Sequence, residues 1–265
     1  MQYTSDTFDE ILASGDYESE VKVVINGVTY TEDQLLDVSI TREVFGGSDL
    51  TIGSACVASC SITLISDTMS GRELSATIPR GSRVEIWERI NGWSMSTENA
   101  AVVGAARVGA AIVGLAAEYL PRNSEWLLQG VFFIDTRDAS SWEGRLVIDG
   151  LDRMALADGN YPSGDVNWPK SDKQVVNLIA GYIGVDVDSS ITNLINRNYQ
   201  IPLIASYTMR EVLQYIGAMY CGNFIINKVG DLQFLSLTGL PAETNLLVTQ
   251  VGNPITFGGV SILVS

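Results

Sequence analysis

Alternating apolar and polar residues predict β-strands between residues 20 and 151. Apolar residues alternate over 20–25 and lead into Asn26-Gly27, a pair that favours a tight turn, so a β-hairpin is expected there. Further strand-like runs lie at residues 36–42, 57–65, 82–90, 125–136 and 144–151. The run at 82–90 is expected to end in a second turn pair, Asn91-Gly92. Several short strands with glycine-rich turns are typical of a barrel or a sandwich.

Helical periodicity replaces strand alternation after residue 160. Residues 171–184 carry apolar residues along one helical face and end on a glycine, which predicts an amphipathic helix. Thr208 with Glu211 three residues later is a capping-box pattern. The helix that it begins is expected to stop at Gly222.

A hairpin and a return to strands are predicted after these helices. Residues 223–227 and 232–237 flank a short turn. The block from 165 to 240 is therefore predicted to be helix, connector, helix and hairpin, an insertion between β segments. Strand-like residues return at 246–251 and 260–265, and a partner or further sequence is expected to complete the last pairing.

The charge of the chain is strongly acidic, with 31 acids against 16 bases and a formal net charge of −15. Such a surface repels phosphates and argues against extended contact with nucleic acid. The asymmetry is steepest in residues 1–40, where Lys22 is the only base. Residues 1–19 are expected to be a solvated acidic arm in which Phe8, Ile11 and Leu12 can form one short helical turn.

The composition also argues against catalysis and metal binding. Histidine is absent, which removes the commonest general base, the Ser-His and Cys-His nucleophile pairs, and most zinc and iron sites. The cysteines Cys56, Cys60 and Cys221 are odd in number, and reduced core cysteines are favoured over a disulfide or a metal pair. We therefore predict no enzymatic activity, no metal and no cofactor.

Three sets of side chains are candidates for chemistry, and each has a simpler explanation. Two carboxylates can cleave a glycoside, but chance proximity is favoured for the four aspartates near strand ends, Asp135, Asp138, Asp149 and Asp152. Ser171 and Lys170 are neighbours, but Ser171 is better placed as a helix N-cap. Core or interface positions are favoured over a sugar-binding face for the tryptophans Trp87, Trp93, Trp126, Trp142 and Trp168. The glycine-rich FGGSD and FGGVS lack the lysine of a phosphate loop and are predicted turns.

The segments also follow one another in a familiar order. The β segments are VKVVINGVTYTEDQLLDVSITR, DLTIGSACVASCSITL, RGSRVEIWERI, WLLQGVFFIDTRD and GRLVIDGLDRMALAD. The helices and hairpin lie in WPKSDKQVVNLIAGYIGV and YTMREVLQYIGAMYCGNFIINKVGDLQFLSL. In this order the chain resembles the hub proteins at the tip of phage tails, including the hub domain that begins many tail-associated lysins and the late control protein D family. The last two stretches are the most specific part, because they look like the insertion between the two tube-like barrels of a hub.

The resemblance implies an α+β, mainly β fold, a tail-tube-like split β-barrel interrupted by a helix-helix-hairpin insertion. The expected domains are an acidic N-terminal arm at 1–19, a first tube-like β-barrel at 20–160, an α+β insertion domain at 161–242, and the start of a second, incomplete tube-like β unit at 243–265.

The resemblance also implies a function, partners and a location. The expected protein is a structural hub, a homotrimeric ring that continues and closes the tail tube and adapts threefold to sixfold symmetry. Its expected partners are the tail tube or distal tail protein ring, the tape measure protein, and tip or fibre proteins, with DNA passing through without specific binding. The N-terminus carries no secretion signal, so assembly in the bacterial host cytoplasm is expected before the protein reaches the virion tail tip. The alternatives are a carbohydrate-binding β module of a host-adhesion device and, third, a glycosidase that uses the aspartates.

Residues 99–117 are foreign to this pattern. Near-repeats place glycine at every fifth position, a spacing that gives neither a helix nor a strand one apolar face, and Arg107 with three glycines weakens a membrane-spanning helix. Small residues allow close packing of backbones, so three such loops can meet on the axis of a ring. The hypothesis is a channel plug or a transient contact with the host membrane; the alternative is a locally packed or disordered hairpin insert. The candidate residues are Val102, Val103, Gly104, Arg107, Val108, Gly109, Ile112, Val113, Gly114 and Leu115.

Overall fold

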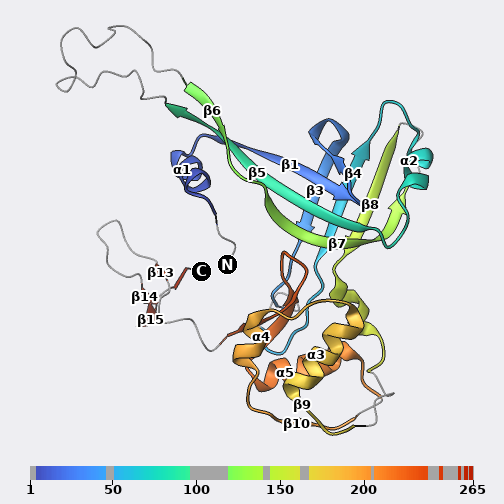
Figure 1. Ribbon diagram of the computed structural model, residues 1–265, viewed down its shortest axis with the longest axis vertical. Coiled ribbons are helices and arrows are strands. Elements are labelled where there is room, and N and C mark those ends of the chain that lie inside the picture. Colours follow the sequence, from blue (N-terminus) through green and yellow to red (C-terminus); the bar gives the residue numbers. More distant parts are fainter. Residues whose placement is uncertain are drawn as a thin grey trace, which may run out of the picture. The chain divides into compact units, whose positions relative to one another are not determined.

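The computed structural model describes residues 4–45, 51–95, 119–139, 144–161, 167–203 and 206–237, together with four two-residue strands between 245 and 264. The described chain is mainly β, with one large antiparallel sheet and several short helices (Figure 1). It divides into two compact units. Unit 1 comprises Met1–Thr41, Ala58–Arg153 and Asn227–Gly230, and unit 2 comprises Arg42–Val57, Met154–Ile226 and Asp231–Ser265.

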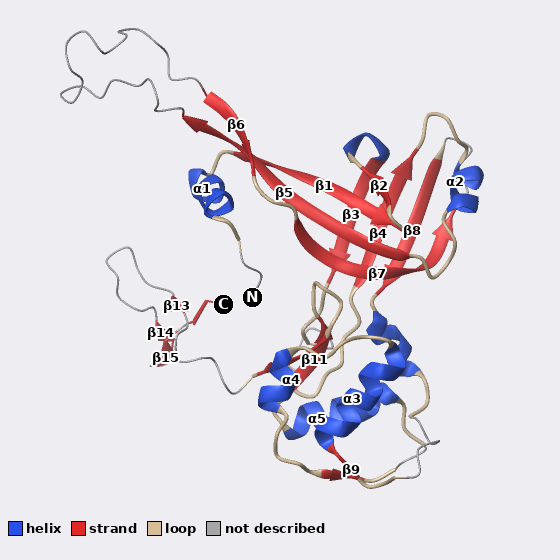
Figure 2. Ribbon diagram, in the orientation of Figure 1, coloured by secondary structure: helices blue, strands red, loops and turns tan. Residues whose placement is uncertain are grey.

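An eight-stranded antiparallel sheet forms unit 1, in the order β2-β1-β5-β7-β8-β4-β3 with β6 paired to the far end of β5 (Figure 2). Its elements are α1 (Asp6–Ser14), β1 (Tyr17–Ile25), β2 (Val28–Tyr30), η1 (Glu32–Gln34), β3 (Leu35–Thr41), β4 (Ser59–Ile65), α2 (Gly71–Thr77), β5 (Arg83–Met95), β6 (Tyr119–Asn123), β7 (Leu127–Asp138) and β8 (Arg145–Leu151). Within the described residues β2 and β3 each pair on one side, so these strands form an open sheet. The closed tube-like barrel and the predicted domain boundaries stay predictions.

The first predicted hairpin is confirmed. β1 and β2 pair antiparallel, and Asn26 (φ 49°) and Gly27 (φ 83°) take the left-handed conformations that a two-residue turn requires. The strands predicted at 36–42, 57–65, 125–136 and 144–151 are also present, with ends displaced by one or two residues.

The predicted turn at Asn91-Gly92 is wrong. β5 continues through both residues to Met95, and Asn91 pairs with Asn123 of β6. Backbone pairing with a strand that follows later in the chain overrides the turn preference of this dipeptide. The glycine has another role, because a Cβ at Gly92 would lie 2.7 Å from the Ile11 Cγ2 atom.

The core of unit 1 consists of the side chains that alternate toward one face of the sheet. Its buried residues are Val23, Ile25, Tyr30, Ala58, Cys60, Ile62, Leu64, Leu74, Ile78, Val84, Ile86, Phe132, Ile134, Leu146 and Ile148. Helix α2 adds Leu74 to this core and contacts β8. A capping box at Ser70 and Glu73 starts α2, which the sequence analysis did not predict.

Helices and a hairpin form unit 2. Its elements are η2 (Arg153–Asp158), β9 (Lys170–Ser171), α3 (Asp172–Ile183), α4 (Ser189–Leu194), β10 (Gln200–Ile201), α5 (Met209–Met219), β11 (Gly222–Ile226) and β12 (Leu232–Ser236). Both predicted helices are confirmed with their caps: Ser171 and Gln174 form a capping box at α3, Thr208 and Glu211 form one at α5, and Gly184 ends α3 in the left-handed conformation.

The predicted hairpin, β11 with β12, is confirmed, and a segment from the first part of the chain runs beside it. Residues 42–57 belong to unit 2, where Ala55 bridges parallel to Phe224 in β11. Asn223, fully buried, holds this segment: its amide nitrogen donates to the carbonyls of Val44 (2.8 Å) and Thr51 (2.9 Å). Its amide oxygen accepts from the Ser54 main-chain N–H (2.8 Å).

Two further details of unit 2 differ from the prediction. α5 ends at Met219 rather than Gly222, and Cys221 takes the left-handed position (φ 53°) before β11 begins. The predicted connector contains α4, a six-residue helix capped by Asp188 and anchored by the buried Ile191. Helices this short leave no periodic pattern of useful length.

The predicted strands at 246–251 and 260–265 lie largely outside the described residues. Two strand pairs are described there, β13 (Asn245–Leu246) with β16 (Leu263–Val264) and β14 (Thr256–Phe257) with β15 (Val260–Ser261).

In the described part of the chain, no helix has the combination of length and apolar character needed to cross a membrane.

Replacing Gly222 by alanine is expected to destabilise unit 2 by about 1–3 kcal/mol. A Cβ at this position would lie 2.3 Å from the Leu235 carbonyl oxygen and 2.3 Å from Phe234 Cζ. Gly181→Ala in α3 is the matched control: nothing lies within 4 Å of its Cβ, so it is expected to stabilise by about 0.5–1 kcal/mol. Urea unfolding of both variants measures the difference. Equal shifts in the two variants would contradict the packing described here.

Candidate functional site

The predicted plug or membrane-contact residues, from Val102 to Leu115, lie outside the described residues. The structure does describe the two strands from which they extend. β5 ends at Met95 and β6 begins at Tyr119, and the two residues are paired (Figure 1). Residues 96–118 therefore join neighbouring antiparallel strands of one sheet.

Helix α1 packs against the β5–β6 ribbon. Ile11 is 3% exposed and lies against Gly92. Glu10 forms an ion pair with Arg122 of β6, and the Ser5 main-chain N–H donates to Glu125 Oε1 (2.6 Å). The N-terminal segment is thus not simply a solvated acidic arm, because apolar and polar contacts hold it on the sheet.

Both caps of α1 support this placement. The Ser5 hydroxyl accepts from the Phe8 main-chain N–H (3.2 Å) and itself donates to Glu125. Gly15 ends the helix in the left-handed conformation. The hydrogen bond from the Ser5 side chain is the largest effect that lowers the pKa of Glu125 below its ordinary value. The base of the ribbon is therefore braced by a helix whose ends are both satisfied.

A cluster of charged and aromatic side chains comes from β1, from β5 and from Trp126, which directly precedes β7. Glu20 accepts from Arg89 Nε (2.6 Å) and Asn91 Nδ2 (2.9 Å), and the Asn91 hydrogen bond is the main cause that lowers the pKa of Glu20. The Arg89 guanidinium lies 4.6 Å from the centroid of the Trp126 ring, and Lys22 Nζ lies 4.3 Å from it. Two cations thus contact Trp126, which is partly buried.

The tryptophans do not form an open sugar-binding platform in the described structure. Trp87 is partly buried and donates through Nε1 to Glu85 (3.1 Å). Trp168 belongs to unit 2 and packs against Tyr161 with ring centroids 5.4 Å apart. Trp142 and the Trp93 side chain lie outside what the structure describes.

The four candidate aspartates do not share a role. Asp149 accepts from the Ser61 hydroxyl (2.8 Å) and the Thr136 hydroxyl (2.9 Å). Asp152 is buried and accepts from the Ala58 main-chain N–H (2.8 Å). Asp135 and Asp138 lie exposed on β7. Asp149 therefore joins β8 to β4 and β7, and Asp152 joins the residues just outside β8 and β4.

The other candidate nucleophiles also have structural roles. The Ser171 hydroxyl accepts from the Gln174 main-chain N–H (3.3 Å), so the predicted N-cap is confirmed. Lys170 Nζ lies 5.4 Å from the centroid of the Trp168 ring.

Cys60 is buried, and burial raises the pKa of its thiol to about 12, which disfavours the reactive thiolate. Cys56, Cys60 and Cys221, all within the described residues, form no disulfide. No group of three or more metal-ligating side chains converges within the described ranges.

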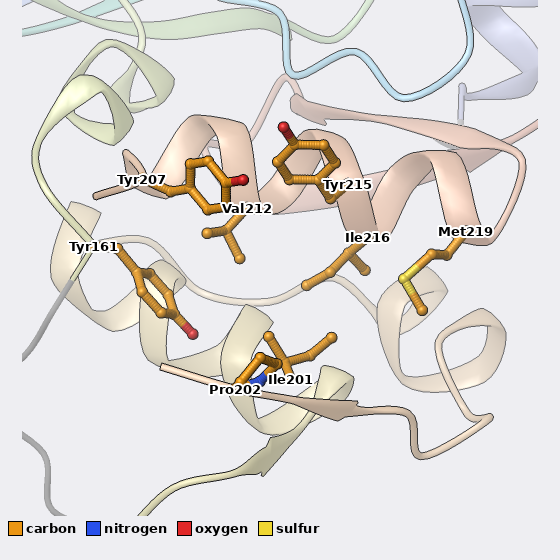
Figure 3. Close-up of a pocket in the computed structure, with 8 residues that line it drawn as sticks. All are labelled: Tyr161, Ile201, Pro202, Tyr207, Val212, Tyr215, Ile216 and Met219. Carbon is orange, nitrogen blue, oxygen red and sulfur yellow. The ribbon is translucent and has the colours of Figure 1, made fainter. Parts of the chain in front are cut away.

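A pocket that the sequence analysis missed lies in unit 2, between α5, β10 and the segment at Tyr161 (Figure 3). Its volume is about 270 Å³, and it is lined by Tyr161, Ile201, Pro202, Tyr207, Val212, Tyr215, Ile216 and Met219. Tyr215 and Met219 are four residues apart on α5, and both are exposed. Two large apolar residues beside the buried stripe of a helix are the sequence signal that points to such a surface.

No protein-family model and no curated protein matches this sequence. Among solved structures, the 43 kDa tail protein of prophage MuSo2 from Shewanella oneidensis is similar over 86% of this chain, with 14% identity and a TM-score of 0.48. The tail protein from Neisseria meningitidis MC58 is similar over 84% of this chain, with 11% identity and a TM-score of 0.44. The matches cover 57% and 53% of those proteins, so this chain spans little more than half the length of either.

Ile11→Ala is expected to release α1 from the β5–β6 ribbon. Removing a buried isoleucine costs about 2–5 kcal/mol, and a nine-residue helix without tertiary contacts is marginal in water. Hydrogen exchange of the α1 amides should become at least about tenfold faster. Leu12→Ala is the control, because Leu12 is 47% exposed and should leave exchange unchanged. Similar effects of both variants would show that Ile11 does not anchor the helix.

Glu20→Gln is expected to reduce the loss of thermal stability that the chain undergoes at acidic pH. The pKa of Glu20 is lowered from 4.5 in the folded chain, so its contribution is present above that value and is lost as the pH falls through the folded pKa. The parent should lose more thermal stability than the variant between about pH 5 and pH 3. Glu18→Gln, an exposed position on the same strand, serves as control. Parallel melting-temperature profiles for parent and Glu20→Gln would refute the role of this carboxylate.

Proposed function

We propose that this chain is a non-catalytic structural protein of a phage or prophage tail, and that it forms the hub at the tail tip. The supporting observation is the order of elements along the chain. A large antiparallel sheet is followed by a unit made of α3, α5 and the hairpin β11–β12. This is the order that the resemblance of the sequence to tail hubs implies. The proposed location is the tail tip of the virion.

The use of polar groups supports a structural role. Asp149 joins neighbouring strands through hydrogen bonds, Asp152 accepts from the main-chain N–H of Ala58, Ser171 caps a helix, and Cys60 is buried as a thiol. Candidate catalytic groups that are already engaged in the fold are poorly placed to move protons or attack a substrate. These engagements favour the non-catalytic proposal over the enzyme alternative.

The proposed assembly is a homotrimeric ring that continues and closes the tail tube. Its proposed partners are the tail tube or distal tail protein ring, the tape measure protein, and tip or fibre proteins. A formal net charge of −15 suits a channel through which DNA passes, because acidic walls repel phosphates and lysine-rich walls would hold them.

Native mass spectrometry of the purified full chain, alone and mixed with the tail-tube protein of the same phage, tests this proposal. We expect trimers of the chain, and complexes that join three copies to six copies of the tube protein. A chain that stays monomeric and does not bind the tube protein at assembly concentrations would refute the proposed hub function.

A deletion variant tests the proposed plug, first in the same ring-assembly measurement and then in assembled particles. The chain lacking residues 100–117 should still form rings, because α1 braces the β5–β6 ribbon outside that segment. Particles built with it should leak DNA early or infect poorly. Particles that remain as infectious and as tightly sealed as the parent would refute both the plug and the membrane contact.

A further inference from the structure

The pocket of unit 2 contains a buried hydroxyl group that is not used within the described chain. Tyr161 is 2% exposed, and its Oη has no hydrogen-bond partner among the described residues. Burial raises the pKa of Tyr161 well above its ordinary value, so the group stays protonated and is a donor. Figure 3 shows this hydroxyl directed toward the side of the pocket formed by Ile201 and Pro202. A buried donor of this kind favours a ligand that brings an acceptor.

The rest of the pocket favours an apolar, uncharged group. Val212 and Ile216 of α5 line it beside Ile201. The rings of Tyr207 and Tyr215 lie 5.4 Å apart. The neighbouring Tyr207 is the largest cause that raises the pKa of Tyr215, so the Tyr215 hydroxyl stays protonated and uncharged. Among the described lining residues none is charged, so a charged headgroup would lose its hydration without compensation.

Size and surroundings indicate that the apolar group belongs to a polypeptide. The volume of about 270 Å³ exceeds the roughly 150 Å³ of a cavity that binds benzene, so an aromatic or branched aliphatic side chain fits. On the rim, Tyr215 is 55% exposed and Met219 is 39% exposed. A small molecule inside the pocket would leave these rim side chains in water, whereas a polypeptide crossing the rim would cover them. Tyrosine and methionine are enriched at protein interfaces, and anchors in such pockets carry much of the binding energy.

We propose that this pocket is an anchor site for a partner polypeptide. The partner inserts one aromatic or branched aliphatic side chain, and its main-chain carbonyl accepts a hydrogen bond from Tyr161 Oη. That the partner is another tail protein rests on the proposed function, whereas the chemistry of the pocket does not.

Two probes test this proposal by NMR titration of the full chain. N-acetyl-L-phenylalanine N-methylamide supplies a ring with main-chain carbonyls, and toluene supplies a ring alone. Tyr161→Phe should weaken binding of the amide probe about fivefold, the effect of one net hydrogen bond, and leave toluene binding unchanged. Tyr182→Phe, on the exposed side of α3 and outside the pocket, should change neither. Tyr215→Ala at the exposed rim should weaken the binding of both probes.

Several results would overturn the proposal. One is a lower melting temperature of Tyr161→Phe, which would mean that the hydroxyl already has a partner within the chain. Another is equal binding of the amide probe by parent and Tyr161→Phe, or no binding by the parent. Tighter binding of free acetophenone than of the amide probe would indicate a small-molecule site instead. By contrast, a dimer of the chain that the amide probe dissociates would support the anchor site and identify the partner polypeptide as a second copy.

Measurements of ring assembly on the same variants separate this inference from the proposed function. If the probes bind as predicted but no rings form, the proposed hub function is refuted and the proposed anchor site is supported. If rings form with the tube protein but the parent chain binds neither probe, the proposed anchor site is refuted and the proposed hub function is supported.

Discussion

Strand β5 pairs with three other strands, and the arrangement of unit 1 depends on its register. Along β1 the pairing runs without interruption from Tyr17 opposite Gly92 to Ile25 opposite Val84. Along β7 the register shifts between Ile86 and Trp87, which leaves one extra residue on β7. A slip of one residue would turn the buried side chains of β5 to the opposite face, so the buried core fixes this register. The pairing with β7 ends at Glu88, so the same edge of β5 is free to pair with β6 from Asn91 to Met95, while β1 stays paired to the other edge as far as Gly92.

Unit 2 depends instead on a few buried polar side chains whose hydrogen bonds are satisfied. Asn223 joins the segment at 42–57 to β11 through three hydrogen bonds, and its removal would leave three main-chain groups without this partner. Asp172, also fully buried, accepts from the main-chain N–H of Tyr199 (3.2 Å) and from the hydroxyl of Tyr220. Burial is the main cause that raises the pKa of Tyr220 to about 12, which keeps that hydroxyl a donor. These contacts link parts of the chain that lie far apart in sequence, and they specify one packing of the helices and the hairpin.

Local chemistry made much of the fold predictable, and the failures occur where distant residues decide. Asn26-Gly27 makes a turn because the residues on each side pair with each other. Asn91-Gly92 has the same local preference, but β6 supplies a pairing partner and Ile11 requires the glycine. The pairing of 42–57 with β11 leaves no periodic signal, because it depends on Asn223, a single polar residue far along the chain. The pocket was missed for a related reason: the pattern of α5 shows which face is apolar, but not which segments leave part of that face uncovered.

Several basic side chains of this acidic protein are engaged in contacts within the chain. Arg89 pairs with Glu20, Arg122 with Glu10, and Arg210 with Asp158. The guanidinium of Arg137 donates to the carbonyls of Ser75 (2.6 Å) and Ile78, and that of Arg153 lies 3.7 Å from the centroid of the Phe133 ring. Guanidinium groups that are engaged in this way must give up internal contacts before they can bind a phosphate, and these contacts use only a few of the 31 acids. Each of the three ion pairs neutralises one acid together with one base, so the net charge stays at −15. What the pairing changes is availability, because these guanidinium groups are less free to bind phosphates than the composition alone indicates.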